Sequence, residues 1–223
     1  TDETTVDARF LRARVEHERG QPQRAEQMLE TLRADIVERY SPRSPQVEAI
    51  VYAPEGLLAS AREGQIFVDT STAEPASTAK IRKDFEARRA LFVDAPLART
   101  PVEAEQGRLN TMVGADDAVF AKLRPVLAAY CENIVHAGPP GHGHTLKLIN
   151  NFIAQAIATA TAEACAAAVK SGLSLKKLHE LISAGPVNNG IFQMLVGRML
   201  ENNGDLTGLK FTLANAMKDL RYY

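Results

Sequence analysis

Three polar side chains that could handle a proton and a small polar ligand lie within five residues, at Lys147, Asn150 and Asn151. Spacings of three and four place them on neighbouring parts of one helical face. Lys147 stands between Leu146 and Leu148 in the first turns of a predicted helix. Partial burial and the positive end of the helix dipole both lower the pKa of a lysine. Such a lysine suits general acid–base catalysis, although the spacing fits equally well a lysine whose ammonium simply reaches solvent.

Two further polar segments directly follow predicted strands. The run Asp-Thr-Ser-Thr at 69–72 follows the apolar run 66–68, and Asp-Ala-Pro-Leu-Ala-Arg-Thr at 94–100 follows 91–93. In open α/β sheets, ligands bind at the carboxyl ends of the strands. Arg99 in the second segment could hold a carboxylate, phosphate or sulfonate in two-pronged fashion, whereas a single arginine with no other support is more often only a surface residue.

The glycines at 138, 141 and 143 are spaced G-x-x-G-x-G, which differs from the G-x-G-x-x-G turn of dinucleotide-binding folds. They predict a flexible or tight turn that leads into the following helix. His142 and His144 lack a Cys or carboxylate partner at a suitable spacing, so we expect no metal site. The two cysteines, Cys131 and Cys165, lie in apolar stretches and predict neither a disulfide nor a zinc site.

Three zones of the chain must position these residues. Residues 1–39 have helical periodicity interrupted at Gly20-Gln21-Pro22, which predicts a helical hairpin or, alternatively, one tetratricopeptide-like unit. Residues 40–141 alternate short apolar runs, at 66–68, 91–93 and 111–113, with helical stretches, which predicts a mainly parallel sheet covered by helices. Residues 142–223 predict an all-helical part, led by one helix over about 144–171 that Gly172 ends, with further helices after Ser174, Gly190 and Gly208.

The overall composition is that of a globular protein. Of 223 residues, 45% are hydrophobic and 24% charged, and 26 Lys and Arg balance 27 Asp and Glu to a formal charge of -1. This excludes a disordered or collagen-like chain and leaves no global field that would attract nucleic acid or an anionic membrane. Gln155, Glu163 and several threonines interrupt the apolar stretch of the long helix. We therefore expect a cytoplasmic protein with neither a membrane nor a nucleic-acid partner.

Four segments together resemble the β-hydroxyacid dehydrogenase family, and they occur in the family's order. They are VDTSTAEP at 68–75, LFVDAPLARTPVEAEQGRLNTMVG at 91–114, GPPGHGHTLKLINNF at 138–152 and FTLANAMKDL at 211–220. The resemblance implies a Rossmann-like α/β domain followed by an all-α domain. It also implies NAD or NADP as cofactor, hydride transfer between the nicotinamide and a small anionic aldehyde or 3-hydroxy acid, and assembly into a homo-oligomer.

The same resemblance assigns roles to individual residues. It implies that Lys147 is the acid–base residue with Asn151 beside it, and it implies no metal. The residues implied to bind substrate are Ser71, Ala98, Arg99, Thr100 and Asn150, and those implied to bind the cofactor are Thr72 and Lys218. Ala98-Arg99-Thr100 replaces the family's usual Ser-Gly-Gly. That variant is similar to the sulfolactaldehyde reductase subgroup and implies a substrate with a more demanding anion than a simple carboxylate.

Two departures from the family pattern lead to further expectations. No G-x-G-x-x-G turn occurs before residue 40, so residues 40–141 resemble a partial nucleotide-binding domain and residues 1–39 look foreign to the family. The helical domain at 142–223 looks truncated after Lys218-Asp219-Leu220. We therefore expect weak binding of NAD(P)H, because a glycine-rich turn normally holds the pyrophosphate. A non-catalytic remnant or fusion that acts through helical assembly stays open as the alternative, and the choice between NAD and NADP is not determined.

Overall fold

The computed structural model describes residue 23 and the stretches 45–204 and 212–223. The chain divides into two units, 1–43 and 44–223, and all the elements named below belong to the second. The predicted hairpin over 1–39 and the predicted helix start after Gly208 lie outside the described residues.

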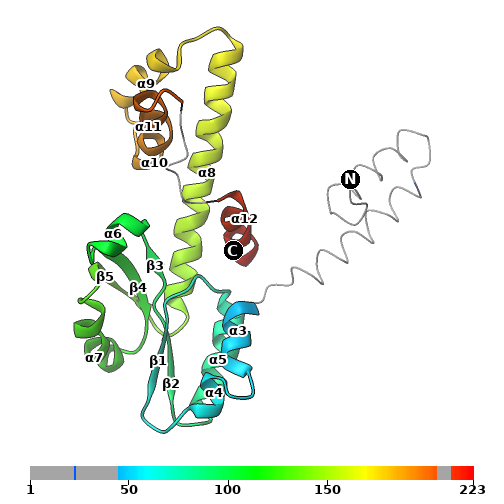
Figure 1. Ribbon diagram of the computed structural model, residues 1–223, viewed down its shortest axis with the longest axis vertical. Helices are drawn as coiled ribbons and strands as arrows, with labels where there is room; N and C mark the ends of the chain where they lie inside the picture. The colour runs from blue at the N-terminus through cyan, green and yellow to red at the C-terminus, as the bar shows by residue number, and fades with distance from the viewer. Residues whose placement is uncertain (1–22, 24–44, 205–211) are drawn as a thin grey trace. The chain divides into compact units, whose positions relative to one another are not determined.

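A five-stranded sheet forms the centre of the α/β part (Figure 1). Its strands are β1 (Ile66–Asp69), β2 (Leu91–Asp94), β3 (Leu97–Ala98), β4 (Leu109–Gly114) and β5 (Cys131–Gly138). β1 pairs with β2 in parallel and β4 with β5 in parallel, whereas β4 is antiparallel to both β2 and β3. The predicted parallel pairing is thus present, as two parallel pairs that run in opposite directions.

The antiparallel pairing decides where the chain goes after β2. Asp94 pairs with Gly114, Leu97 with Thr111 and Ala98 with Asn110, all in one register. The chain therefore continues past the carboxyl end of β2 along β4, towards the start of β4. The short strand β3 and the strand β5 are not among the strands that the sequence predicts. The sequence does not predict β5 because its residues, CENIVHAG, contain no continuous apolar run. Its burial in the structure is correspondingly low and irregular.

Helices cover both faces of this sheet, and alternate strand residues pack on opposite sides, as the two-residue period of a strand requires. Phe92 belongs to one buried cluster with Ile81 and Phe85, while the next residue, Val93, packs in a second cluster with Leu127. The helices of this part are α3 (Pro45–Tyr52), α4 (Leu57–Ser60), α5 (Pro75–Glu86), α6 (Pro101–Glu105) and α7 (Asp117–Leu127). α5 and α6 both begin with proline, which suits the first helical position.

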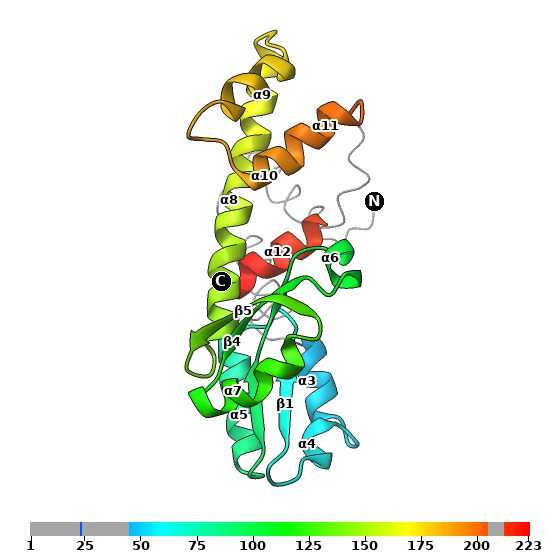
Figure 2. The same ribbon diagram turned by 90° about the vertical axis from the view of Figure 1, so that its left-hand side faces the viewer.

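The helical part begins with α8 (His142–Lys170), close to the predicted helix over 144–171. Its 29 residues span about 43 Å at 1.5 Å per residue, and Gly172 ends it with φ +74°. The remaining elements are α9 (Leu175–Ser183), α10 (Gly190–Phe192), a π-helical turn (Gln193–Gly197), α11 (Arg198–Glu201) and α12 (Leu213–Tyr222). The first turns of α8 pack on β4 and β5, and α12 lies beside α8 (Figure 2).

By length and composition, α8 could cross a membrane, with a mean hydropathy of 1.5 over its most apolar 18 residues. The sequence-based expectation that no stretch of the chain qualifies is therefore too strict. One such helix is weak evidence for a membrane span, since a core helix of a soluble protein meets the same criterion. Of that 18-residue window of α8, 11% is buried within the described part of the chain.

Candidate active site

The glycine-rich turn before α8 joins the helix tightly to the ends of β2 and β4. The carboxylate of Asp94, at the end of β2, is fully buried and accepts hydrogen bonds from the amides of Gly141 (2.7 Å) and His144 (2.9 Å). It thereby satisfies amide groups that a helix start leaves without partners. A Cβ on Gly143 would lie 2.4 Å from the carbonyl oxygen of Met112, so only glycine fits there. The predicted tight turn into the helix is confirmed.

Lys147 lies one turn further along α8 and is buried, with 8% of its surface exposed. Burial is the main cause that lowers the pKa of Lys147 below the ordinary lysine value, and the charge of Lys218 lowers it further. The Asp219 carboxylate acts in the opposite direction and raises this pKa. The net direction is downward, so the neutral amine forms more readily than in an ordinary lysine. That Lys147 exchanges a proton with a substrate stays a prediction.

α12 brings a second group of polar side chains to the same part of α8. The side-chain amide of Asn151 donates to Oδ2 of Asp219 at 2.6 Å, and Nζ of Lys218 lies 3.0 Å from Oδ1 of the same carboxylate. The amide of Asn150 donates to Oδ1 of Asn151 at 3.2 Å. Asp219 is 4% exposed and is not among the site residues that the sequence predicts. Its position directly after Lys218 in the Lys-Asp-Leu segment is the signal that could have found it.

The loop after β1 completes this group. The amide of Ser71 donates to Oδ1 of Asp69 at 2.8 Å, and Nζ of Lys218 donates to the carbonyl of Thr72 at 3.4 Å. The Ser71 hydroxyl is buried and has no hydrogen-bond partner among the described residues. The structure therefore brings the 69–72 loop, the first turns of α8 and the end of α12 to one place.

Ala98, Arg99 and Thr100 lie apart from these contacts, at the end of β3 and the start of α6. Arg99 has a backbone φ of +85°, and its guanidinium pairs with Glu132 and donates to the carbonyl of Arg108 at 2.6 Å. Thr100 caps α6 together with Glu103. Within the described part of the chain, no hydrogen bond or ion pair links Arg99 to Lys147 or Ser71. The strand-end rule predicts that Lys147, Asn151, Ser71 and Arg99 line one cleft. This stays a prediction, and it requires Arg99 to exchange Glu132 for a ligand.

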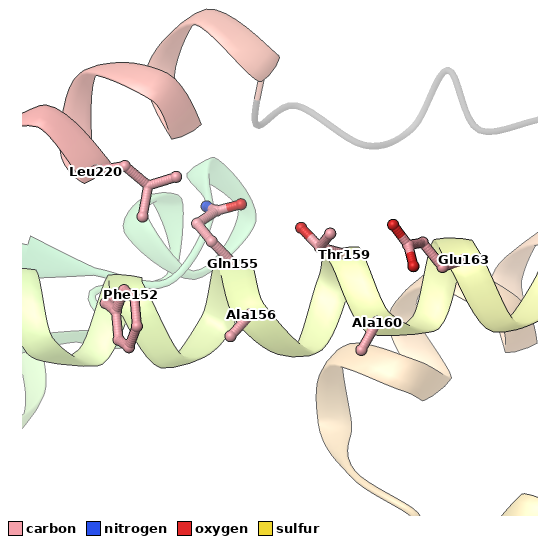
Figure 3. A pocket seen from close by; sticks show the side chains of 7 residues that line it. All are labelled: Phe152, Gln155, Ala156, Thr159, Ala160, Glu163 and Leu220. Atoms are coloured by element: carbon pink, nitrogen blue, oxygen red, sulfur yellow. The ribbon is translucent and has the colours of Figure 1, made fainter.

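A groove of about 410 Å³ runs along α8 from Phe152 to Glu163 (Figure 3). Its lining comes from one side of α8 and from α12, and comprises Phe152, Gln155, Ala156, Thr159, Ala160, Glu163 and Leu220. None of the predicted site residues lines it. The groove is therefore a neighbour of the candidate site, and the proton-handling groups lie outside it.

Two protein-family models match the chain in succession. One describes the NAD binding domain of 6-phosphogluconate dehydrogenase and matches residues 8–138, and the other describes the NAD-binding of NADP-dependent 3-hydroxyisobutyrate dehydrogenase and matches residues 141–223. The first match covers most of the α/β layer and the second covers the helical part that carries the buried lysine, so the chain has the two-part architecture of an NAD-binding domain followed by a helical domain. The chain belongs to the β-hydroxyacid dehydrogenase family. The first match begins at residue 8, so the expectation that residues 1–39 are foreign to the family is wrong for residues 8–39. That this segment forms a helical hairpin stays a prediction.

Individual relatives agree with this membership. The chain is 36% identical over 149 residues to 2-(hydroxymethyl)glutarate dehydrogenase of Eubacterium barkeri, covering 67% of this chain and 50% of that protein. It is 32% identical over 193 residues to 3-hydroxyisobutyrate dehydrogenase of Pseudomonas aeruginosa, covering 84% of this chain and 64% of that protein. Among solved structures, 3-hydroxyisobutyrate dehydrogenase of Mycobacterium tuberculosis with L-serine matches with a TM-score of 0.67 and 28% identity, over 74% of this chain and 58% of that one. The chain thus spans between half and two thirds of the length of these relatives.

Proposed function

We propose that this chain works as an NAD(P)-dependent oxidoreductase that interconverts a small anionic 3-hydroxy acid and the corresponding aldehyde. The observation that carries the proposal is the buried Lys147, whose lowered pKa and position near Asp219 suit proton exchange with a substrate hydroxyl. Membership of a family whose models are NAD-binding domains supports the choice of NAD or NADP as cofactor.

The residues of this site fit the nicotinamide end of such a cofactor. The Ser71 hydroxyl is buried without a partner, and Thr72 follows it at the carboxyl end of β1, so these two residues would face the ring and the reacting carbon. When bound, the nicotinamide takes up or supplies the hydride. The neutral amine of Lys147 accepts the proton of the substrate hydroxyl during oxidation, and its ammonium form returns a proton to the carbonyl oxygen during reduction. Asn151, held by Asp219, keeps the substrate oxygen in line with Lys147, and Lys218 holds the loop through the Thr72 carbonyl.

The test is an assay of this chain with a panel of small 3-hydroxy acids at millimolar NAD+ or NADP+, because residues 1–40 contain no glycine-rich turn. We expect formation of the reduced nucleotide with at least one acid and a clear preference for one of the two nucleotides. No turnover with any acid at saturating nucleotide would overturn the proposal.

Arg99 is proposed to select the anionic end of the substrate after releasing Glu132. Replacing it with glycine relieves the strained φ of +85°, since glycine adopts this conformation freely, and removes a partly exposed ion pair and one exposed hydrogen bond to the Arg108 carbonyl. We therefore expect Arg99→Gly to leave the free energy of unfolding within about 1 kcal/mol while it raises KM severalfold for sulfonate- or phosphate-bearing acids relative to simple carboxylates. Steady-state kinetics on a matched set of acids, alongside urea unfolding, measure both. An unchanged preference would refute the clamp.

We further propose that the chain forms a homo-oligomer in the cytoplasm. Apolar side chains on α8 are exposed, with Ile149 and Phe152 at 41% and Ile153 at 53%, and Leu213 at the start of α12 is 89% exposed. Ile149, Phe152 and Ile153 are spaced three and four residues apart and so lie on one side of α8, and exposed apolar surface of this kind marks an interaction surface. Leu206, Leu209 and Phe211, which the sequence predicts to add to this surface, lie outside the described residues. We expect light scattering to yield a multiple of 24.3 kDa, and a clean monomer would argue against the proposal.

A further inference from the structure

The loop that carries Ser71 and Thr72 is held by four different elements. The Asp69 carbonyl accepts from the amide of Ala95, after β2, at 2.8 Å, and the Thr70 carbonyl accepts from the amide of Leu97, in β3, at 3.2 Å. The next two carbonyls are held by side chains, that of Ser71 by His144 of α8 at 3.1 Å and that of Thr72 by Lys218 of α12 at 3.4 Å. Four consecutive carbonyls are thus fixed, and the two nearest the candidate site depend on one side chain each.

His144 is suited to hold the Ser71 carbonyl because both of its ring nitrogens have partners. Its side chain is fully buried, Nε2 faces the Ser71 carbonyl, and Nδ1 lies 2.8 Å from the hydroxyl of Thr78 in α5. A carbonyl oxygen only accepts, so Nε2 must carry the proton. Burial lowers the pKa of His144, against the opposing effects of Asp69 and Asp94, so the ring is neutral near pH 7. With Nε2 protonated, Nδ1 of the neutral ring can only accept, so the single proton of the Thr78 hydroxyl points to Nδ1 at 2.8 Å instead of the Glu74 carbonyl at 3.1 Å.

The consequence concerns the Ser71 hydroxyl. It is buried and has no partner among the described residues, although it lies in the same loop whose backbone is held on every side. An unpaired buried hydroxyl is unfavourable unless a ligand supplies its partner. With the Ser71 carbonyl bound to His144 and the Ser71 amide bound to Asp69, the backbone on both sides of this side chain is fixed.

We propose that His144 is a positioning residue that, through the Ser71 carbonyl, orients the Ser71 hydroxyl for the ligand of the Lys147 site. This inference rests on the proposed function in naming that ligand as the substrate and nicotinamide. The contact between His144 and the Ser71 carbonyl is present without any ligand. His144 stands three residues before Lys147 on the same helix, so one short stretch of α8 sets both the proton-handling amine and the loop opposite it.

The experiment compares two variants of His144 whose side-chain amides reach the positions of different ring nitrogens. In His144→Gln the amide nitrogen can take the place of Nε2 and donate to the Ser71 carbonyl, whereas in His144→Asn the shorter amide reaches only the position of Nδ1. We expect amide hydrogen exchange of residues 69–73, measured without cofactor, to be at least tenfold faster in His144→Asn and within threefold of the parent in His144→Gln. The matched control is His136→Gln, because His136 also holds a backbone carbonyl, that of Ala115 at 2.6 Å, on a different part of the sheet.

Equal exchange in the Asn and Gln variants would overturn the inference. A measurement on the parent chain adds a test that needs no variant to fold. The ¹⁵N chemical shifts of the His144 ring must report the Nε2–H tautomer, and the Nδ1–H tautomer would overturn the inference as well.

In steady-state kinetics we expect His144→Asn to raise the substrate KM at least fivefold with kcat within twofold. His144→Gln should keep the parent KM. A parent chain without turnover would count against the proposed function alone, because the exchange and tautomer results do not depend on it.

Discussion

Replacing Lys147 with alanine should lower turnover by about 10²- to 10⁴-fold, the usual contribution of a positioned general acid–base group. Lys147 is buried in α8 and lies close enough to Asp219 and Lys218 of α12 for their charges to affect its pKa, and no other described amine has both its burial and its lowered pKa. The variant removes proton transfer and leaves the loop after β1 intact, so nucleotide affinity should change by less than about threefold. Stopped-flow or steady-state turnover and a nucleotide titration measure the two quantities.

The matched control for this prediction is Lys170→Ala, which removes an exposed lysine from the other end of α8. It should leave turnover unchanged. If Lys147→Ala keeps the parent rate, or if the two variants behave alike, the acid–base assignment is wrong and a non-catalytic role for the chain becomes the better explanation.

The same lysine sets the expected pH dependence. During oxidation the neutral amine is the base, so kcat/KM should rise as the pH increases through the pKa of Lys147, which burial holds below the ordinary lysine value. Reduction needs the ammonium form, so its rate should fall over the same pH interval.

The folding stability should also depend on the pH through Lys147. Because the pKa of Lys147 is lower in the folded chain than in the unfolded chain, the unfolded chain binds this proton more tightly. The free energy of unfolding therefore decreases as the pH falls from the unfolded pKa to the folded pKa. Lys147→Met should remove this component.

Replacing Gly143 with alanine should destabilise the fold by about 3 kcal/mol, at the upper end of what overpacking in a filled interior costs. The new methyl group would lie 2.4 Å from the carbonyl oxygen of Met112 and 2.7 Å from that of Asp94. Both oxygens are backbone atoms of strands, Met112 within β4 and Asp94 at the end of β2, and cannot move away without disturbing the sheet. The start of α8 would shift instead and carry Lys147, one turn further on, out of place, so turnover should fall as well.

Urea unfolding followed by circular dichroism measures this loss against Gly190→Ala as the control. Gly190 also stands at a helix start, but a Cβ there meets no atom within 4 Å and its φ is not positive. Alanine should therefore be neutral or stabilise by up to about 1 kcal/mol. Equal unfolding midpoints for the two variants would show that the contact between the start of α8 and the strand ends is not tight.

The sequence by itself determined the features that depend on residues close together along the chain. The spacing of four between Lys147 and Asn151 predicts that they share a helix face, and an unbroken stretch predicts α8 to within two residues at its start and one at its end. The apolar runs that end at Asp69, Asp94 and Gly114 predict β1, β2 and β4. Helical and strand periods are local properties, so a short window contains all the information that such predictions need.

Only the tertiary structure decided which of these faces meet. Asn151 is bound by Asp219, 68 residues away, and the Thr72 carbonyl by Lys218, 146 residues away. Arg99 follows a strand as predicted, yet the antiparallel continuation of β2 along β4 brings it to Glu132 at the start of β5. The partners of His144, on α5 and after β1, are equally remote in sequence. Such contacts form when the chain closes long loops around a shared core, and the preference of a residue for helix or strand contains no information about which distant residue will become its partner.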